Sequence, residues 1–391
     1  MSSAPGLLHF MKINKLSKFI IVIYIITLIF WAVFNFLSGW KSLLEGPAFN
    51  YLLTPFLVFM TVLPLIGGLI GIYNSIRWGG WKSSVGRSLL CMSLGLITWS
   101  GGMVIWNYYL FFTTISVPYP SFADVSFMLS WPLWTIGAIF LSIAAGANLG
   151  IKNLKGKVFL LIIPIIISAF SYYFLVVLAR QGMVSTYDNI LKTFFDLAYP
   201  IGDVVILTIA ALVFGLSYKY LGGKYRIAIY FILAGFMMNY FADFTFSYTT
   251  TLGTYYNGSL SDILFVTAMA LLSVGVAGFV LPDYKNKKFS IIDSNTVDNN
   301  SIFHQILVTI IKKQESVIGL SAWYEANNVS GLIIDQAHNL ASFSGSGKEA
   351  IDRLVFRYEE LFGKASRAVC KEAVRDLTVR MQPEEIPDSL K

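Results

Sequence analysis

The chain has 391 residues, of which 56% are hydrophobic and only 13% are charged. Soluble domains carry about 25% charged residues, so this composition excludes an ordinary water-soluble protein and indicates a chain that lies mostly in hydrocarbon. The net charge of +7 does not indicate a nucleic-acid-binding protein, because residues 289–391 hold 11 Lys or Arg and 14 Asp or Glu, and the basic excess therefore lies in the apolar part.

Apolar segments long enough to cross a hydrocarbon core of about 30 Å recur along the first 282 residues. Eight spans are predicted, at residues 19–38, 51–73, 88–112, 125–147, 157–179, 198–218, 226–248 and 260–281. The first span is too long for the core of a signal peptide and has no small-residue cleavage site, so we interpret it as a retained helix.

The basic residues of the connections predict the orientation of these helices, because Lys and Arg near helix ends stay cytoplasmic. Fifteen fall on one side of an eight-span arrangement: Lys12, Lys15, Lys18, Arg77, Lys82, Arg87, Lys152, Lys155, Lys157, Lys219, Lys224, Arg226, Lys285, Lys287 and Lys288. The other side has only Lys41, Arg180 and Lys192. We therefore expect a multi-pass protein of the cell membrane with both termini cytoplasmic.

Acidic residues show the opposite bias. Those of the outer half are Glu45, Asp124, Asp188, Asp196, Asp203, Asp243 and Asp262, whereas Asp283 is the only one on the inner side. Asp and Glu do little to orient membrane helices, so this bias needs another explanation.

Three of these carboxylates belong to a short recurring motif, in Ser121-Phe-Ala-Asp124, Pro200-Ile-Gly-Asp203 and Ser259-Leu-Ser-Asp262. Each copy precedes an apolar run and is predicted to open the fourth, sixth or eighth helix, which suggests a weak repeat of a two-helix unit. A structural interpretation is available for each copy. Ser-x-x-Asp is a capping box with Ser121 or Ser259 as N-cap, and Pro200 suits a first helical turn.

The functional interpretation is a pocket that opens to the outside and binds a cation or an amine between carboxylates and aromatic rings. Its candidate ligand-binding residues are Asp124, Asp203, Asp243, Asp262, Asn239, Trp106, Tyr199 and Tyr240. Aromatic side chains at this depth are also expected as an interfacial belt, so both interpretations stay open. Asp243 is not explained by capping, because it lies well inside the seventh span, and Asn239 or Asn107 is its expected partner.

No pattern in the sequence predicts catalysis. The three histidines, His9, His304 and His338, lie outside the predicted spans, and no spacing of His, Cys, Asp or Glu indicates a metal site. No Gly-rich phosphate loop precedes a helix either. We therefore expect neither an enzyme nor a cofactor.

The composition changes after the last span. Residues 1–18 are predicted as a cytoplasmic N-terminus, 19–282 as the transmembrane domain, 283–300 as a polar linker and 301–391 as a small cytoplasmic α+β domain. Hydrophobic periodicity in the last region predicts helix, hairpin, helix, helix, with the hairpin turn near Asn339 and the last two helices separated at Gly363. We expect this tail to bind a signalling partner or a second copy of the chain, or else to fold back on the membrane part.

Patterns at Tyr119-Pro-Ser-Phe-Ala-Asp124, Ala198-Tyr-Pro-Ile-Gly-Asp203 and Asn239-Tyr-Phe-Ala-Asp243 give the chain a resemblance to a known module. Residues 17–282 resemble the multi-pass membrane sensor region found in front of prokaryotic diguanylate cyclases and histidine kinases. The resemblance implies a sensing role for Asp124, Asp203, Asp243 and Asp262. The tail departs from that architecture, because it has neither a Gly-Gly-Asp/Glu-Glu-Phe loop nor kinase nucleotide boxes.

The sequence thus favours a membrane sensor or signalling adaptor whose output is binding. A transporter or channel for a small solute or cation is the alternative, supported by the hairpin repeat and by Pro55, Pro64, Pro132 and Pro164 in or near spans. An intramembrane enzyme is disfavoured by the lack of histidines and of paired mid-span acids.

Overall fold

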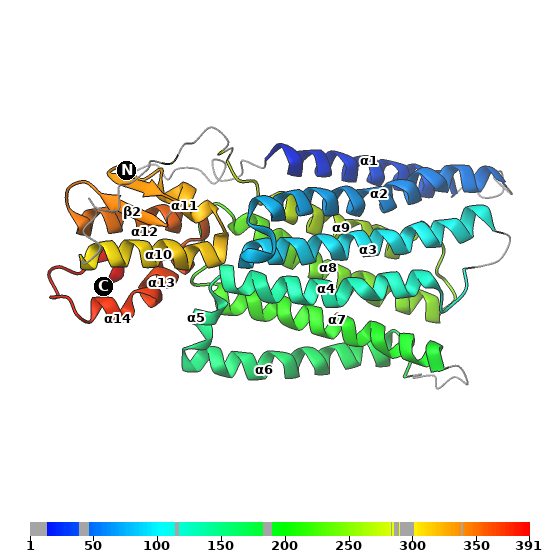
Figure 1. The fold of residues 1–391 in the computed structure, drawn as a ribbon. Helices are drawn as coiled ribbons and strands as arrows, with labels where there is room; N and C mark the ends of the chain where they lie inside the picture. The colour runs from blue at the N-terminus through cyan, green and yellow to red at the C-terminus, as the bar shows by residue number, and fades with distance from the viewer. Residues whose placement is uncertain are drawn as a thin grey trace, which may run out of the picture.

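The computed structural model describes residues 14–38, 47–113, 117–182, 190–282, 284, 289, 301–337 and 339–391. The described chain is mostly helical, and eight of its helices are long and apolar enough to cross a membrane, which confirms the predicted number. These helices lie side by side, and a smaller domain made of the last ninety or so residues sits at one end of the bundle (Figure 1).

The membrane part consists of α1 (Lys15–Ser38), α2 (Pro47–Arg77), η3 (Gly80–Lys82), α3 (Ser84–Phe112), α4 (Phe122–Ala144), α5 (Ala147–Ile151), α6 (Leu154–Ser171), the π-helical η4 (Tyr172–Leu178), α7 (Ile190–Ser217), α8 (Arg226–Thr251) and α9 (Leu260–Ala277). The tail consists of α10 (Ile302–Ile318), α11 (Ser321–Ala326), β1 (Leu332–Asp335), β2 (Leu340–Phe343), α12 (Gly347–Phe362), α13 (Lys364–Ala373), α14 (Arg375–Thr378) and η5 (Asp388–Leu390).

One predicted helix start is wrong. α7 begins at Ile190 rather than at residue 198, so Pro200 and Asp203 lie inside the helix and not in its first turn. Proline is tolerated within membrane helices because neighbouring groups satisfy the backbone carbonyl that it leaves unpaired. The motif copy at Pro200 therefore does not open a helix, and capping cannot explain Asp203.

Small residues bring the central helices close together. A Cβ atom on Gly275 of α9 would lie 2.5 Å from the Cγ1 of Ile232 in α8, so only glycine permits this approach. Lipid is as apolar as the surface of a membrane helix, so the hydrophobic effect does not drive helices together within a membrane. Close packing of this kind holds them together instead. α9 and α3 are the most buried of the eight spans, while α1 and α6 lie at the periphery of the bundle (Figure 1).

The tail is built around its own apolar core. α10, α12 and α13 contribute fully buried side chains, including Ile310, Leu354 and Tyr358. β1 and β2 form an antiparallel hairpin that pairs Leu332 with Phe343. The predicted turn at Asn339 is present, and this residue has the left-handed φ of 56° that Asn tolerates in tight turns. The short helix α11 was not predicted.

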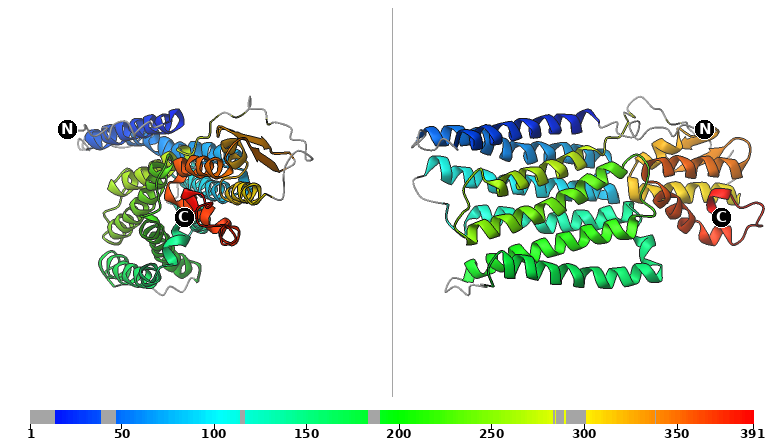
Figure 2. Two further views of the ribbon diagram at one scale, coloured as in Figure 1. Left: turned by 90° about the vertical axis from the view of Figure 1, so that its left-hand side faces the viewer. Right: turned by 180° about the vertical axis from the view of Figure 1, so that it is seen from behind.

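The tail is joined to the membrane part by backbone hydrogen bonds at what we call the junction, residues 220–226 between α7 and α8 and residues 360–365 between α12 and α13. Lys224 N donates to Glu360 O at 2.8 Å and Tyr225 N to Leu361 O at 3.2 Å, while Ala365 N donates to Tyr220 O at 3.1 Å. Viewed from this end, α1 and α6 lie outside the outline of the tail (Figure 2).

Four buried aromatic rings close the junction. Tyr225 stacks on Phe279 with ring centroids 5.3 Å apart, and Phe362 of the tail packs against Tyr225 at 5.4 Å and against Trp78 at 6.0 Å. Each ring lies at the end of a different segment, so the tail seals the ends of α2, α8 and α9 together. Aromatic pairs of this kind contribute about 0.5–1.5 kcal/mol each beyond the area they bury.

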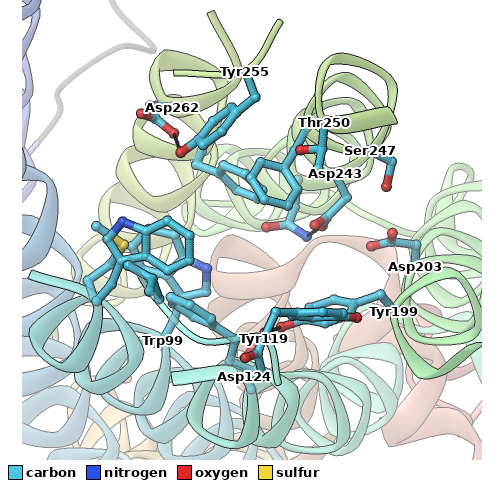
Figure 3. A pocket seen from close by; sticks show the side chains of 18 of the residues that line it. Trp99, Tyr119, Asp124, Tyr199, Asp203, Asp243, Ser247, Thr250, Tyr255 and Asp262 are labelled. Carbon is cyan, nitrogen blue, oxygen red and sulfur yellow. Dashed lines mark hydrogen bonds between the residues drawn. The ribbon is translucent and has the colours of Figure 1, made fainter. Parts of the chain in front are cut away.

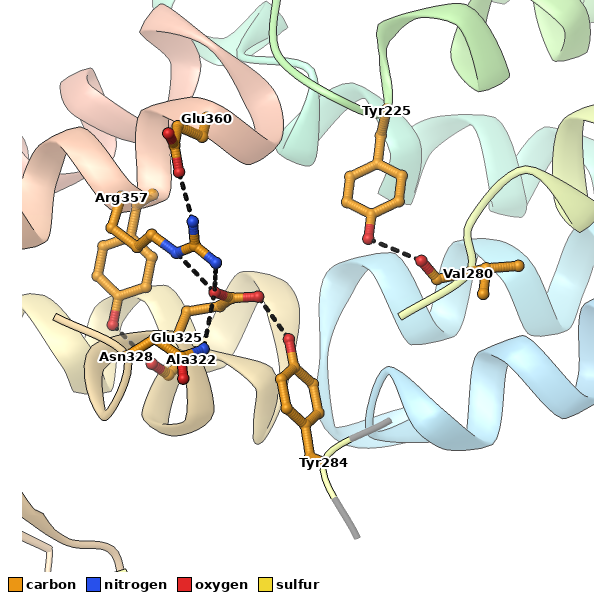
Figure 4. Close-up of polar contacts among 9 residues, drawn as sticks. Tyr225, Val280, Tyr284, Ala322, Glu325, Asn328, Arg357 and Glu360 are labelled. Atoms are coloured by element: carbon orange, nitrogen blue, oxygen red, sulfur yellow. Dashed lines mark hydrogen bonds and ion pairs between the residues drawn. The ribbon is translucent and has the colours of Figure 1, made fainter. Parts of the chain in front are cut away.

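A buried carboxylate anchors the tail next to the junction (Figure 4). The Glu325 side chain is 1% exposed and pairs with the Arg357 guanidinium at 2.7 Å. It also accepts a hydrogen bond from the Tyr284 hydroxyl, on the segment that leaves α9. Burial and then this hydrogen bond raise the pKa of Tyr284, so the hydroxyl stays protonated and remains a donor. Glu325 therefore links two helices of the tail to the exit of the membrane part.

Candidate functional site

A cavity of about 570 Å³ lies at the end of the bundle opposite the tail. Its walls come from α2, α3, α4, α7, α8 and α9 and from the connections before α4 and α9. Five carboxylates and two basic residues line it: Asp124, Asp196, Asp203, Asp243, Asp262, Arg180 and Lys192. Cavities of this size hold drug-sized molecules. The four carboxylates selected from the sequence thus share one space (Figure 3).

Asp124 is both a helix cap and a wall of the cavity. Its Oδ2 accepts hydrogen bonds from the backbone N–H of Ser121 at 2.7 Å and from the Ser121 hydroxyl at 3.0 Å. Its Oδ1 accepts one from the Tyr199 hydroxyl of α7 at 2.8 Å. The predicted capping box is therefore present, and the carboxylate is fully occupied by partners of the protein itself.

Asp262 is satisfied in a related way. Ser259 is the N-cap residue, as predicted, but its side chain makes no cap hydrogen bond. Asp262 accepts from the backbone N–H of Gly258 and, at 3.1 Å, from the Tyr255 hydroxyl. Burial and then the charge of Asp262 raise the pKa of Tyr255, so this hydroxyl also stays a donor.

Asp203 and Asp243 differ from the other two carboxylates. They lie inside α7 and α8, Asp203 is buried and Asp243 half-buried, and the two side chains interact directly with each other. Asn239 Nδ2 donates to Asp243 Oδ2 at 2.8 Å, as predicted, whereas Asn107 instead bonds Thr61 at 2.9 Å. Two carboxylates this close repel each other unless a proton or a cation lies between them.

A polar cluster lines the cavity between the connection before α4 and the start of α7. The Tyr119 hydroxyl donates to Asp196 Oδ1 at 2.6 Å, and Arg180 Nη1 donates to the backbone carbonyl of Asp196 at 2.6 Å. Burial and then the hydrogen bond to Asp196 raise the pKa of Tyr119, which keeps this donor in place at neutral pH.

Aromatic rings cover the rest of the wall. Trp99 lies 5.6 Å from Phe127 and 6.1 Å from Phe265, measured between ring centroids, and Trp131 meets Tyr199 edge-on at 4.9 Å. Rings at these distances form a continuous apolar surface. A ligand in this cavity therefore meets both carboxylates and aromatic faces: Asp203 and Asp243 lie on the side away from Trp99, while Asp124 and Asp262 lie at the bottom and top of the view in Figure 3.

Most of these lining residues were predicted from the sequence, and some were not. Trp106 and Tyr199 line the cavity, but Tyr240 does not, because its hydroxyl is turned to Ser171 at a distance of 3.1 Å. Trp99 was missed although it precedes Trp106 by two helical turns and so lies on the same face. Arg180 was noted only as one of the few basic residues on the acidic side.

The fold and the cavity define a multi-pass membrane protein with a polar cavity at one end and a packed tail at the other. No known protein family, curated protein or solved structure matches the chain. The resemblance to prokaryotic sensor regions thus rests on the short motifs alone.

Proposed function

We propose that the protein is a membrane sensor or signalling adaptor, in which a small ligand in the cavity shifts α7 and α8 and the tail passes this change to a partner. In this proposal the cavity faces the outside of the cell membrane and the tail faces the cytoplasm, in agreement with the distribution of basic residues. The chain itself carries out no catalytic step, and the output is binding by residues 301–391.

One observation carries the proposal. The two helices that bring Asp203 and Asp243 to the cavity are joined to each other by the segment that the tail holds, residues 220–226. α8 runs from the junction at Arg226 to Asp243, a length of about 25 Å at 1.5 Å per residue. A rigid helix fixed at both places can couple the two sites, which is the element that an allosteric mechanism requires.

The alternative is a transporter or channel, and one feature of the structure favours it. Asp203 lies close to the middle of α7, whereas the sequence placed it at the outer end of a helix. Transporters bind their solutes near the midplane of the membrane, on interrupted helices. Pro200, one turn before Asp203, removes a backbone hydrogen bond of α7 at this depth, although the helix continues through it.

A comparison of binding with flux separates the two functions. Purified protein is titrated with small cationic, neutral and anionic solutes, and binding is followed by the fluorescence of the cavity tryptophans Trp99, Trp106, Trp131 and Trp134. The solute that binds is then added in radiolabelled form to sealed proteoliposomes. A sensor leaves its uptake at the rate of protein-free liposomes. Uptake above that rate that saturates with solute concentration would establish transport and refute the sensor.

A further inference from the structure

The carboxylate pair of the cavity has an acceptor beside it that the protein leaves unused. Asn239 is 3% exposed and lines the cavity, and its Oδ1 has no hydrogen-bond partner. The orientation of the amide is fixed, because Nδ2 donates to Asp243. A buried polar atom without a partner costs free energy, and a ligand in the cavity that Asn239 lines can supply the missing donor.

Carboxylates outnumber basic residues in the cavity, because five aspartates line it together with Arg180 and Lys192. Asp203 and Asp243 contribute two carboxylates, and Arg180 is the basic residue close enough to act on Asp203. The hydrogen bond of Arg180 goes to a backbone carbonyl, so its positive charge is still available to offset one carboxylate. An excess of acidic groups remains in the cavity, which favours a cationic ligand over an anionic one.

The acceptors also fit a particular shape of cation. Asp203, Asp243 and Asn239 Oδ1 offer oxygen acceptors, and a primary ammonium carries three N–H donors. A quaternary ammonium has no N–H donor and would leave Asn239 Oδ1 unpaired. Calcium takes six to eight oxygen ligands, more than these side chains supply.

The aromatic part of the cavity wall fits an apolar group on the same molecule. Trp99, Phe246 and Phe265 lie next to one another, with Phe246 6.2 Å and Trp99 6.1 Å from Phe265. All three line the cavity. Aromatic faces attract cations and bury aromatic or aliphatic groups.

We propose that the ligand is a primary amine with an apolar or aromatic substituent, whose ammonium group binds Asp203, Asp243 and Asn239 Oδ1 and whose substituent lies against Trp99, Phe246 and Phe265. This inference gives the class of ligand that the proposed sensor binds. It rests on the sensing function only for what happens after the ligand has bound. Asp124 and Asp262 have the role of shaping the cavity, because their oxygens already accept hydrogen bonds from Tyr199, Tyr255 and backbone groups.

The probe for this site is 2-phenylethylamine, with 2-phenylethanol as a neutral molecule of the same shape and 3-phenylpropionate as an anion. Binding to the full-length protein in nanodiscs is measured by tryptophan fluorescence and by calorimetry. We expect the amine to bind at least tenfold more tightly than the alcohol, because charged hydrogen bonds in a buried site are stronger than neutral ones, and we expect no binding of the anion. Equal binding of amine and alcohol, or no binding of the amine at millimolar concentration, would overturn the inference.

Variants test the individual contacts. Asp203→Asn and Asp243→Asn should each raise the dissociation constant of the amine at least tenfold, and Asn239→Ala should raise it severalfold, without a matching loss for the alcohol. Asp124→Asn removes the same charge from the same cavity. The Asp124 oxygens already accept hydrogen bonds from the protein, so this variant should raise the dissociation constant of the amine by less than about threefold. An equal loss in Asp124→Asn and Asp243→Asn would show that only the overall charge of the cavity matters.

The outcome also separates this inference from the proposed function. If a solute of another class binds and changes the junction, the sensor stands and the amine site is wrong. If 2-phenylethylamine binds with the expected dependence on Asp203 and Asp243 but is taken up into proteoliposomes, the amine site stands and the sensor is wrong.

Discussion

Replacing Gly363 by alanine is expected to release the tail from the membrane part. Gly363 has φ 69° and ψ −149°, a backbone conformation that is essentially restricted to glycine. A Cβ atom there would lie 2.5 Å from the Cα of Gly222 and 2.6 Å from its N, and backbone atoms cannot move aside as a flexible side chain can. We expect Gly363→Ala to cost at least about 2 kcal/mol, from backbone strain and the loss of the junction hydrogen bonds.

The thiol of Cys370 reports the loss of stability in the tail, because it is buried against Gln314 of α10. Cys370 is fully buried in α13, and burial raises its pKa to about 12. The thiolate is the reactive form, so alkylation of Cys370 at pH 8 should be very slow in the native protein and much faster in Gly363→Ala. The modification is quantified by mass spectrometry of the Cys370 peptide, which separates it from the second buried thiol, Cys91.

Gly345→Ala is the matched control. Gly345 has a φ of 84°, and a Cβ atom there would meet nothing within 4 Å. This variant introduces a comparable backbone strain in the same domain, at a cost of about 1 kcal/mol, but leaves the junction intact. If both variants alkylate Cys370 at the same rate, strain alone is responsible, and the contact between Gly222 and Gly363 does not hold the tail.

Arg357→Met is expected to destabilise the tail by about 3 kcal/mol. The variant leaves Glu325 buried at 1% exposure without its counter-charge, and an uncompensated buried charge is strongly destabilising. The Arg357 side chain is 37% exposed, so water takes over part of its role and the effect falls at the low end of the usual range. The measurement is the denaturant dependence of Cys370 alkylation.

Two further variants test whether the loss of stability comes from the buried charge of Glu325. Arg357→Met combined with Glu325→Gln should recover most of the loss, because a neutral amide no longer needs the counter-charge. Arg353→Met, one turn earlier on α12, breaks an exposed pair with Glu349 at 3.5 Å and should change stability by less than about 1 kcal/mol. A large loss in Arg353→Met, or no recovery in the double variant, would contradict a specific role for Glu325.

The features that could be predicted from the sequence are those that depend only on residues close together in the chain. Eight spans follow from the lengths of the apolar runs, and the capping box at Ser121 and Asp124 follows from a four-residue motif. The same local reasoning misplaced Asp203. Pro200 resembles the start of a helix when only its neighbours are considered, but inside a bundle a helix continues through proline.

Features that depend on contacts between distant segments of the chain could not be predicted in this way. The junction pairs Gly222 with Gly363, and nothing near either glycine indicates the other. The cavity pairs Asp203 with Asp243, and their proximity depends on how α7 and α8 face each other rather than on any spacing in the chain. The direction of the Tyr240 side chain was also unpredictable, because its partner Ser171 comes from α6.

Coupling between the cavity and the junction must act in both directions. If occupation of the cavity changes the junction, a change at the junction must alter affinity in the cavity by the same coupling free energy. A tail that only stabilises the fold would show no such dependence. The coupling therefore distinguishes a signalling tail from an accessory one.

The most direct test is hydrogen–deuterium exchange at the junction with and without saturating ligand, using 2-phenylethylamine or whichever solute the fluorescence titration selects. The amides of Tyr225 and Ala365 donate across the junction, whereas the amide of Ser344 donates to Gly331 within the β1–β2 hairpin and serves as the internal control. The account predicts that ligand changes exchange at Tyr225 and Ala365 at least twofold and leaves Ser344 unchanged. Unchanged exchange at the junction of a fully occupied protein would contradict the coupling of cavity and tail.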